Sequence, residues 1–322
     1  MKKKVAVIVS VSPFEPEDVV VASAMHLKNL DFNDFDWKIV YAVDLNNSDD
    51  SRHEALKNLG VEVVARNHRR GKKAGAINDC IDHLLKSSFF PDYVVFFDVD
   101  SRPAENFVIE CISALERDDR AFIASSERRV LNPENSVAET IDAEWRIFNH
   151  LLKRSGFKNF NGLIGVVRGD AVFRERMDEM SLAEDLEFSV RMHAHGYRSI
   201  FVEGTHVCEQ APVSWKDLYT QRKRWYYGGL QILKKDYIRK NKSIGIQVTL
   251  AVIFAHFPVI LLPLLFIAPP FILLSFRKVK KLRILLGMAV YLLVNQLAAI
   301  SSLYRFIRGR EIEWQGVKRV ER

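Results

Sequence analysis

Two carboxylates one residue apart, Asp98 and Asp100, carry the clearest chemistry in this sequence. They follow the apolar run Tyr93–Phe97, which has the length and composition of a buried strand. Because side chains at i and i+2 of an extended segment point the same way, we expect the two carboxylates to converge. Such a pair suits Mg²⁺ or Mn²⁺ shared with a diphosphate, since these ions keep water and substrate oxygens among their ligands. The spacing predicts a metal site, with His206, after the strand Ser199–Val202, as a candidate third ligand.

The elements that must position this pair read as one α/β domain over residues 1–235. Strand-like and helix-like segments alternate, which indicates a mostly parallel sheet flanked by helices. The predicted strands are Val5–Val11, Trp37–Val43, Val61–Ala65 and Tyr93–Phe97, and the predicted helices are Val19–Leu30, Ser51–Leu59 and Ala74–Lys86. Ligands of such sheets bind outside the carboxyl ends of the strands, where Asp44 and the Asp98 pair both lie. The sequence has neither a GxGxxG fingerprint nor a GxxxxGK[ST] loop.

The composition indicates a folded protein in a reducing, cytoplasmic setting. With 47 Lys and Arg against 40 Asp and Glu, the net charge of +7 is basic but mixed, and we expect no nucleic-acid partner. The 48% hydrophobic and 27% charged residues exclude intrinsic disorder. The 3 cysteines lack CxxC spacing, which excludes a disulfide framework and a cysteine zinc site. Acidic residues from Glu15 onward interrupt the N-terminus before a secretory signal forms, so we expect none.

Two long apolar runs near the C-terminus predict membrane helices. The first run, Ser243–Phe276, is 34 residues long, and His256 is its only ionisable side chain. Four prolines interrupt it, so we do not expect one straight helix over the whole run. Ile284–Tyr304 has 21 residues without a formal charge, which fits one membrane span. Two buried helices of a soluble domain are the alternative. We therefore expect a membrane region over residues 236–304, with hydrophobic segments at about 244–275 and 284–304, and a basic cytoplasmic tail over 305–322.

Basic residues on both sides of the two runs leave their topology open. If both runs span, the basic connector Arg277–Arg283 lies outside, against the positive-inside tendency. If the proline-rich run is re-entrant, the connector stays inside. We favour two insertions, with the catalytic domain on the cytoplasmic face of the cell membrane and the basic flanks against anionic headgroups.

Short motifs along the chain point to one enzyme family. Their positions are Tyr41–Asp44 at a strand end, Lys73–Asn78 with the letters KAGAIN, Phe97–Asp100 with the DxD pair, Glu184-Asp185, and Gln221–Trp225 as QxxRW. In this order they resemble the family 2 glycosyltransferases with the GT-A fold. The likeness is to the membrane-bound branch, similar to cellulose-synthase-like and ceramide-glucosyltransferase-like enzymes. The segment Asn161–Arg168 is also similar to the glycine-bearing strand beneath the donor sugar in that family.

The resemblance implies a role for each motif. The implied donor-binding residues are Asp44, Lys73, Asp98, Gly165 and Arg168; the implied acceptor or diphosphate residues are Gln221, Arg224 and Trp225; the implied catalytic residues are Asp185, as general base, and Glu184. Other readings stay open, because Glu184 and Asp185 also suit the first turn of a helix, and Trp225 suits a packing anchor. Should Asp185 not be the base, Glu209 is the next candidate.

The implied activity is metal-dependent, inverting transfer of a hexosyl or N-acetylhexosaminyl group from a nucleotide sugar to a lipid-linked or glycan acceptor. A UDP-sugar is the first expectation for the donor and a GDP-sugar the second. A processive polysaccharide synthase is one alternative, although two membrane segments are too few to enclose a polymer channel. An inactive nucleotide-sugar-binding subunit is the other, and the intact acidic motifs favour an enzyme.

Overall fold

The apolar runs in the first half of the chain form the strands of one sheet. The protein is described by a computed structural model, which covers residues 2–154, 164–256 and 282–312. It divides into two compact units, each described by itself. Among the described residues, the sheet unit comprises those up to Arg129 together with Phe148–Glu209, and the helical unit comprises Val130–Ile147 and those of 210–312. The domain boundary near residue 235 remains a prediction.

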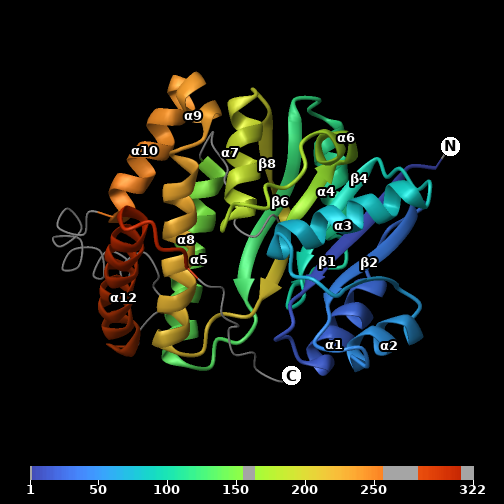
Figure 1. Ribbon diagram of the computed structural model, residues 1–322, viewed down its shortest axis with the longest axis horizontal. Helices are drawn as coiled ribbons and strands as arrows, with labels where there is room; N and C mark the ends of the chain where they lie inside the picture. Colours follow the sequence, from blue (N-terminus) through green and yellow to red (C-terminus); the bar gives the residue numbers. More distant parts are fainter. Residues whose placement is uncertain (1, 155–163, 257–281, 313–322) are drawn as a thin grey trace. The chain divides into compact units, whose positions relative to one another are not determined.

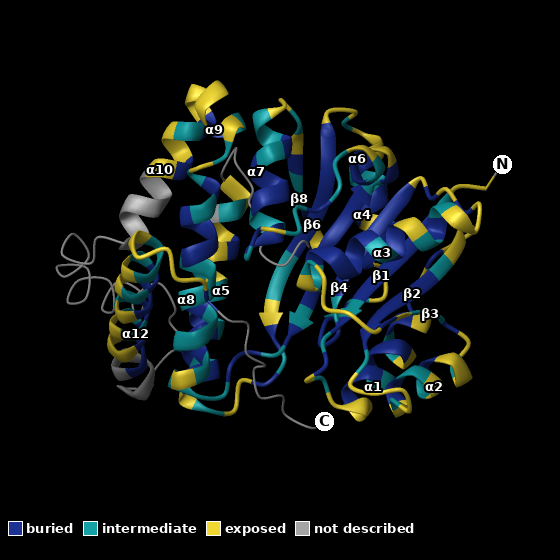
Figure 2. Cartoon of the chain, viewed as in Figure 1, coloured by how far each residue is buried: buried dark blue, intermediate teal, exposed yellow. Residues whose placement is uncertain are grey.

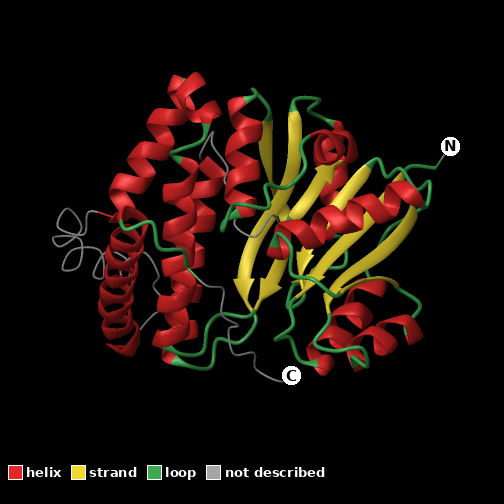
Figure 3. Ribbon diagram, viewed as in Figure 1, coloured by secondary structure: helices red, strands yellow, loops and turns green. Residues whose placement is uncertain are grey.

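Eight strands in the described part of the sheet unit form one mixed sheet (Figures 1 and 3). They are β1 (Lys4–Val11), β2 (Asp36–Asp44), β3 (Glu62–Arg66), β4 (Tyr93–Asp98), β5 (Arg102–Pro103), β6 (Ala121–Val130), β7 (Gly165–Arg168) and β8 (Arg198–Glu209). Their order is β3-β2-β1-β4-β7-β6-β8-β5. The first four strands in this order run parallel, and β7 is antiparallel to both β4 and β6. The predicted α/β sheet is confirmed. The first four predicted strands lie within about a residue of their observed bounds, whereas the strand predicted at Ser199–Val202 continues to Glu209 as β8, so His206 lies within it.

Helices cover both faces of this sheet because its central strands are apolar on both sides. The helices of the sheet unit are α1 (Glu17–Lys28), α2 (Ser51–Asn58), α3 (Lys72–Lys86), α4 (Phe107–Glu116), α6 (Gly169–Arg174) and α7 (Glu184–Ala194). Alternate residues of β1 enter different cores: Val7 packs in the core shared with α1 and α4, and Ile8 packs in the core shared with α3 and α7. The central strands β1 and β4 are accordingly buried along most of their length (Figure 2).

The helical unit consists of amphipathic and apolar helices. They are the first part of α5 (Ser136–Arg154), α8 (Trp215–Ile232), α9 (Asp236–Lys240), α10 (Lys242–His256) and α12 (Leu282–Ile307). Val137, Ile141 and Trp145 of α5 pack together with Leu218 of α8 and Tyr291 of α12. These contacts make one side of α5 a packing face of the helical unit.

One described helix, α12, contains a segment long and apolar enough to cross a membrane, Gly287–Ile307. It covers most of the second predicted span. Of its most apolar stretch 39% is buried within the protein, so length and composition alone leave its membrane role open. The first predicted span begins in α10, and its continuation over residues 257–281 lies outside the described residues.

Candidate active site

The DxD pair lies in a turn at the carboxyl end of β4. The Ser101 amide donates to the Asp98 carbonyl at 2.9 Å, and the Asp98 amide donates to Ser101 Oγ at 3.1 Å. Residues 98–101 therefore form a closed turn, and our expectation of an extended segment is wrong. The turn, and not strand alternation, sets the directions of Asp98 and the buried Asp100.

Lys73 connects this turn to the acidic pair at the start of α7. Its Nζ donates to Asp98 Oδ1 at 2.5 Å and lies 3.8 Å from Glu184 Oε1. Burial lowers the pKa of Lys73, but the charges of Asp98, Glu184 and Asp185 outweigh burial and raise it above its ordinary value. Lys73 is thus a fixed cation among three carboxylates, which come from two motifs far apart in the sequence.

The position of Lys73 depends on the local backbone at the start of α3. Gly71 caps α3 in the left-handed region with φ of 64°, which a side chain rarely adopts. A Cβ on Gly75 would lie 1.9 Å from the Arg70 carbonyl oxygen, so the loop can cross α3 only at a glycine. The two glycines allow the basic loop to turn sharply into the helix that carries Lys73.

The acidic pair Glu184 and Asp185 opens α7. Glu184 is buried and faces Lys73, whereas Asp185 is half-buried and its Oδ1 accepts from the Leu186 amide at 2.7 Å. Asn78, the last residue of KAGAIN, holds the loop that precedes α7: its Nδ2 donates to the Met177 carbonyl at 3.0 Å and its Oδ1 accepts from the Met177 amide at 3.1 Å. The KAGAIN motif therefore positions the acidic pair as well as Lys73.

Glu209, at the end of β8, is a third carboxylate beside the DxD turn. Ser101 Oγ donates to Glu209 Oε1 at 3.3 Å, and Arg128 Nε donates to Glu209 Oε2 at 2.7 Å. Burial raises the pKa of Glu209 to about 7; Arg128 opposes this rise, while the charges of Asp100 and Asp98 add to it. Sequence reasoning named Glu209 only as a substitute base. A signal in the sequence could have found Glu209: it is an acidic residue at a position that the alternation of the strand predicts to be buried.

His206 does not join this group. Burial and the charge of Arg129 lower the pKa of His206, and Glu127 opposes this change. Residues 205–209 alternate between buried and half-buried, so His206 and Glu209 point to opposite faces of β8. The prediction of His206 as a third metal ligand is corrected.

The acidic turn fits a divalent ion only if the ion is shared with a substrate. Within residues 2–154, 164–256 and 282–312, no three His, Cys, Asp or Glu side chains group closely enough to hold a metal by themselves. Asp98 and Asp100 would supply two hard oxygen ligands, and Mg²⁺ or Mn²⁺ would take the rest from phosphate oxygens and water. Two carboxylates at a strand end suit that kind of coordination.

Asp44 ends β2 on the same edge of the sheet. Its Oδ1 accepts from Arg66 Nη1 at 2.6 Å, and Arg66 Nε donates to Asp79 Oδ2 at 2.8 Å. Burial raises the pKa of Asp44, while Arg66, Arg69 and His68 counteract it. Arg66 therefore fixes the orientation of the Asp44 carboxylate.

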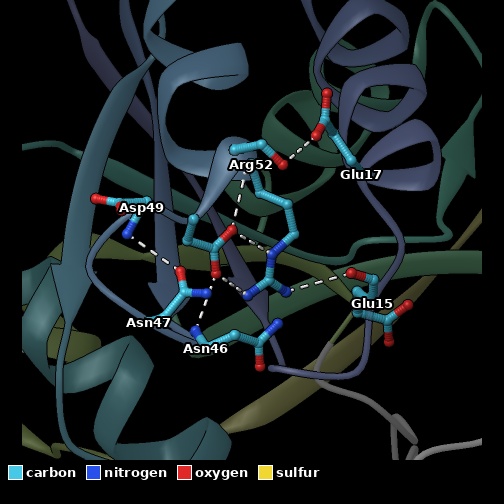
Figure 4. A pocket seen from close by; sticks show the side chains of 8 residues that line it. Glu15, Glu17, Asn46, Asn47, Asp49 and Arg52 are labelled. Atoms are coloured by element: carbon cyan, nitrogen blue, oxygen red, sulfur yellow. Dashed lines mark hydrogen bonds and ion pairs between the residues drawn. The ribbon is translucent and has the colours of Figure 1, made fainter.

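A polar pocket of about 270 Å³ opens next to this strand end (Figure 4). It is lined by Glu15, Glu17, Asn46, Asn47, Asp49, Asp50, Ser51 and Arg52. Arg52 Nη2 donates to the Asp44 carbonyl at 2.9 Å, which joins the pocket wall to the end of β2. Because the Arg52 guanidinium is also paired with Asp50, the lining offers mainly hydrogen-bond acceptors.

β7 separates two residues predicted to bind the donor. Gly165 pairs with Phe96, near the Asp98 end of β4, and a Cβ there would lie 2.6 Å from the Ala124 carbonyl oxygen. The close approach of β6 is thus a packing reason for this glycine. Arg168 pairs with Tyr93 at the opposite end of β4, and its Nε donates to the Ala121 carbonyl at 2.8 Å. The predicted donor contact of Arg168 is corrected to a structural role.

The QxxRW residues lie on α8 in the helical unit. Gln221, Arg224 and Trp225 are half-buried. Arg222, inside the motif, is buried, and its Nη2 donates to Glu144 Oε2 of α5 at 2.5 Å. The guanidinium carbon of Arg222 lies 4.4 Å from the centroid of the Trp225 ring. The sequence pattern gave Arg222 no role.

Comparisons with known proteins identify the family of this chain. The family model described as glycosyl transferase family group 2 matches residues 93–303. The probable glucomannan 4-beta-mannosyltransferase 4 of Oryza sativa subsp. japonica is 23% identical over 212 residues, 63% of this chain and 38% of that protein. The probable glucomannan 4-beta-mannosyltransferase 11 of Arabidopsis thaliana is 24% identical over 213 residues, 63% of this chain and 47% of that protein. The chain thus spans less than half of the length of these relatives.

A solved structure shares the fold. It is the mannosyltransferase PcManGT from Pyrobaculum calidifontis in complex with GDP-Man and Mn²⁺. The TM-score is 0.63 at 16% sequence identity, over 97% of this chain and 89% of that chain. This likeness confirms the predicted GT-A fold.

Proposed function

The chain belongs to glycosyl transferase family group 2, and from that premise we propose that it transfers a hexosyl group from a nucleotide sugar to an acceptor hydroxyl, with inversion. One observation carries the proposal: Lys73 lies between Asp98 of the DxD turn and Glu184 of the acidic pair. A cation shared by the two motifs supports a donor side and a base side that act at the same sheet edge.

We propose a GDP-hexose as donor, with GDP-mannose as the first to test. The support comes from the names of the relatives, which are mannosyltransferases, and from the GDP-Man complex of the structural neighbour. Nothing comparable favours the UDP-sugar expected from the sequence. The pocket beside Asp44 is lined mainly by hydrogen-bond acceptors. Such a lining also suits a nucleobase whose edge presents N–H groups, as guanine does.

Hexosyl transfer from a nucleotide sugar requires that the diphosphate leaving group is stabilised and that the acceptor hydroxyl is activated. Asp98 and Asp100 would hold a divalent ion, which when bound offsets charge on the diphosphate. Lys73, charged and fixed, adds a positive charge at the same place. Glu184 is buried and orients Lys73, which leaves the more accessible Asp185 to take the proton from the acceptor hydroxyl at its carboxylate. Direct attack by that hydroxyl inverts the anomeric carbon.

We propose a lipid-linked or glycan acceptor and a membrane location, with the catalytic residues on the cytoplasmic face. The support is one face of α12, where Val290, Leu293, Leu297, Ile300 and Tyr304 are all exposed. Figure 2 shows exposed positions along this helix. These residues recur at helical spacing, and a soluble surface rarely exposes such a continuous apolar stripe. The whole chain should stay with membranes in a carbonate wash; its release by high salt alone would show peripheral binding through basic residues.

A screen of nucleotide sugars tests the activity. Purified protein is incubated with each GDP- and UDP-sugar, with and without Mn²⁺, and release of the nucleoside diphosphate is measured. We expect release from GDP-mannose that depends on the metal and falls in Asp185→Asn. Release from a UDP-sugar alone would overturn the donor assignment. Binding of nucleotide sugars without any release would favour the alternative of an inactive subunit, and extended products on a glycan primer would favour a processive synthase.

A further inference from the structure

Arg222 occupies a buried site shared by three helices of the helical unit. Its Nη2 donates to Glu144 of α5 at 2.5 Å, and its guanidinium carbon lies 4.4 Å from the Trp225 ring and 5.7 Å from the Tyr291 ring of α12. Only 7% of the residue is exposed. One cation therefore contacts one carboxylate and two aromatic rings.

This arrangement is costly for stability alone. Burying a charge costs free energy that one ion pair recovers only in part. The Nε of Arg222 is buried and forms no hydrogen bond with any of the described residues. Burial lowers the pKa of Arg222, but Glu144, Tyr291 and Tyr226 together outweigh burial and raise it, so the side chain stays charged. A leucine or methionine would fill such a space more simply, which suggests that the flat cation serves the rings it contacts.

The C-terminal helix closes this site. The Tyr291 hydroxyl is hydrogen-bonded to Glu144, and the Tyr226 hydroxyl of α8 donates to Asn295 Oδ1 of α12 at 2.8 Å. A Cβ on Gly287 would lie 2.3 Å from Thr140 Oγ1, so α12 also approaches α5 closely. Figure 1 shows α12 running alongside α8. The contacts of α12 are therefore specific, and they reach the residue that holds Trp225.

We propose that Arg222 is a positioning residue that holds the Trp225 ring in the orientation used by the acceptor, and that Tyr291 of α12 completes this hold. The inference rests on the proposed function, because the acceptor role of Trp225 is part of it. Arg222 touches no reacting atom in this proposal. A purely structural Arg222 would instead stabilise the helices without any selective effect on the acceptor.

Kinetics of the full chain in detergent or lipid test the proposal. Arg222→Lys keeps the charge for Glu144 and loses the flat guanidinium, and Arg222→Met loses both. We expect the acceptor KM to rise by about tenfold in Arg222→Lys, the effect of losing a desolvated cation–π contact, with donor hydrolysis unchanged. The matched control is Arg146→Met, which removes an exposed pair with Asp142 on α5 and should change neither quantity. Equal losses in donor hydrolysis and acceptor transfer would overturn the proposal.

A double-mutant cycle separates action through Trp225 from a general effect. In a Trp225→Ala background, Arg222→Lys should have no further effect on the acceptor KM, because the ring it holds is absent. A full tenfold effect in that background would show that Arg222 acts elsewhere.

A spectroscopic measurement keeps the test independent of turnover. Protein labelled with 5-fluorotryptophan gives a ¹⁹F signal for Trp225, identified by its loss in Trp225→Phe. We expect Arg222→Lys and Tyr291→Leu to shift or broaden that signal, and Arg146→Met to leave it unchanged. An unmoved signal in both variants overturns the proposal even if the enzyme is active. If no donor is turned over by the wild-type chain, the proposed function fails, while the ¹⁹F result still decides whether Arg222 positions the ring.

Discussion

Lys73 Nζ donates to Asp98 Oδ1 at 2.5 Å and so joins the first turn of α3 to the end of β4. The two residues are 25 positions apart, on a helix and on the strand that follows it in the chain. Since Glu184 lies 3.8 Å from the same ammonium group, removing Lys73 leaves two carboxylates without their shared cation.

Lys73→Met should lower turnover by about 10²–10³-fold, because it removes a preorganised charge beside the leaving group. The measurement is nucleoside diphosphate release at saturating donor. Lys72→Met, at the exposed neighbouring position, is the control and should keep wild-type turnover. Equal activity of the two variants would show that Lys73 only stabilises the fold.

Chelation should abolish transfer reversibly. EDTA removes an ion that Asp98 and Asp100 would share with the diphosphate, and added Mn²⁺ should restore activity in the wild type but not in Asp100→Asn. Asp119→Asn, at a fully exposed acidic position nearby in sequence, should respond like the wild type. Full activity after exhaustive chelation would rule out the metal assignment.

Asp185→Asn should reduce transfer by about 10²–10⁴-fold, the usual contribution of a positioned base, with little change in donor affinity. Glu184→Gln should cost less transfer and should instead weaken donor binding through Lys73. The assay compares KM for donor with the rate of acceptor transfer. A dead Glu184→Gln beside an active Asp185→Asn would move the base to Glu184.

Glu209→Gln should lower the free energy of unfolding at pH 7 by about 1 kcal/mol, less than the loss of a fully charged buried pair with Arg128, because burial raises the pKa of Glu209 to about 7 and the carboxyl is already partly neutral there. Urea unfolding measures the change. The double variant Glu209→Gln with Arg128→Met should recover part of the loss, since neither charge then remains. No recovery would mean that Arg128 has a second partner of equal weight.

The Asp50–Arg52 pair should make stability depend on acid pH. A hydrogen bond from Arg52, opposed by burial, lowers the pKa of Asp50 to about 2. A carboxyl whose pKa is depressed by folding stabilises the protein above its unfolded pKa of about 4, and this contribution is lost as the pH falls towards 2. It amounts to about 2 kcal/mol at pH 7.

Asp50→Asn should therefore lower the urea midpoint at pH 7 and flatten its fall between pH 4 and 2. Asp49→Asn, at an exposed position next to it, should change neither. An unchanged acid slope in Asp50→Asn would show that other carboxyls govern this range.

Local sequence determined the strands and the polar residues at their ends. Apolar runs such as Val5–Val11 can be buried only in the middle of a covered sheet, so their pattern alone predicts β1 and its neighbours. Asp44 and Asp98 follow such runs directly, and Lys73 begins the next helix, so their shared edge of the sheet could be inferred from a parallel order. The turn at residues 98–101 could not, because a hydrogen bond from Ser101 ends the strand where the sequence alone suggested continuation.

Tertiary structure alone decided which distant residues meet the site. Glu209 joins the DxD turn and His206 does not, because the register of β8 fixes which residues face Ser101. Arg168 lies at the far end of β4 because β7 runs antiparallel to it, a direction that no local pattern encodes. Arg222 gains its role only when α5 and α12 bring Glu144 and Tyr291 to it. Strand direction, register and helix packing are set by contacts between segments far apart in the chain. The residues next to a given position in the sequence do not determine these contacts.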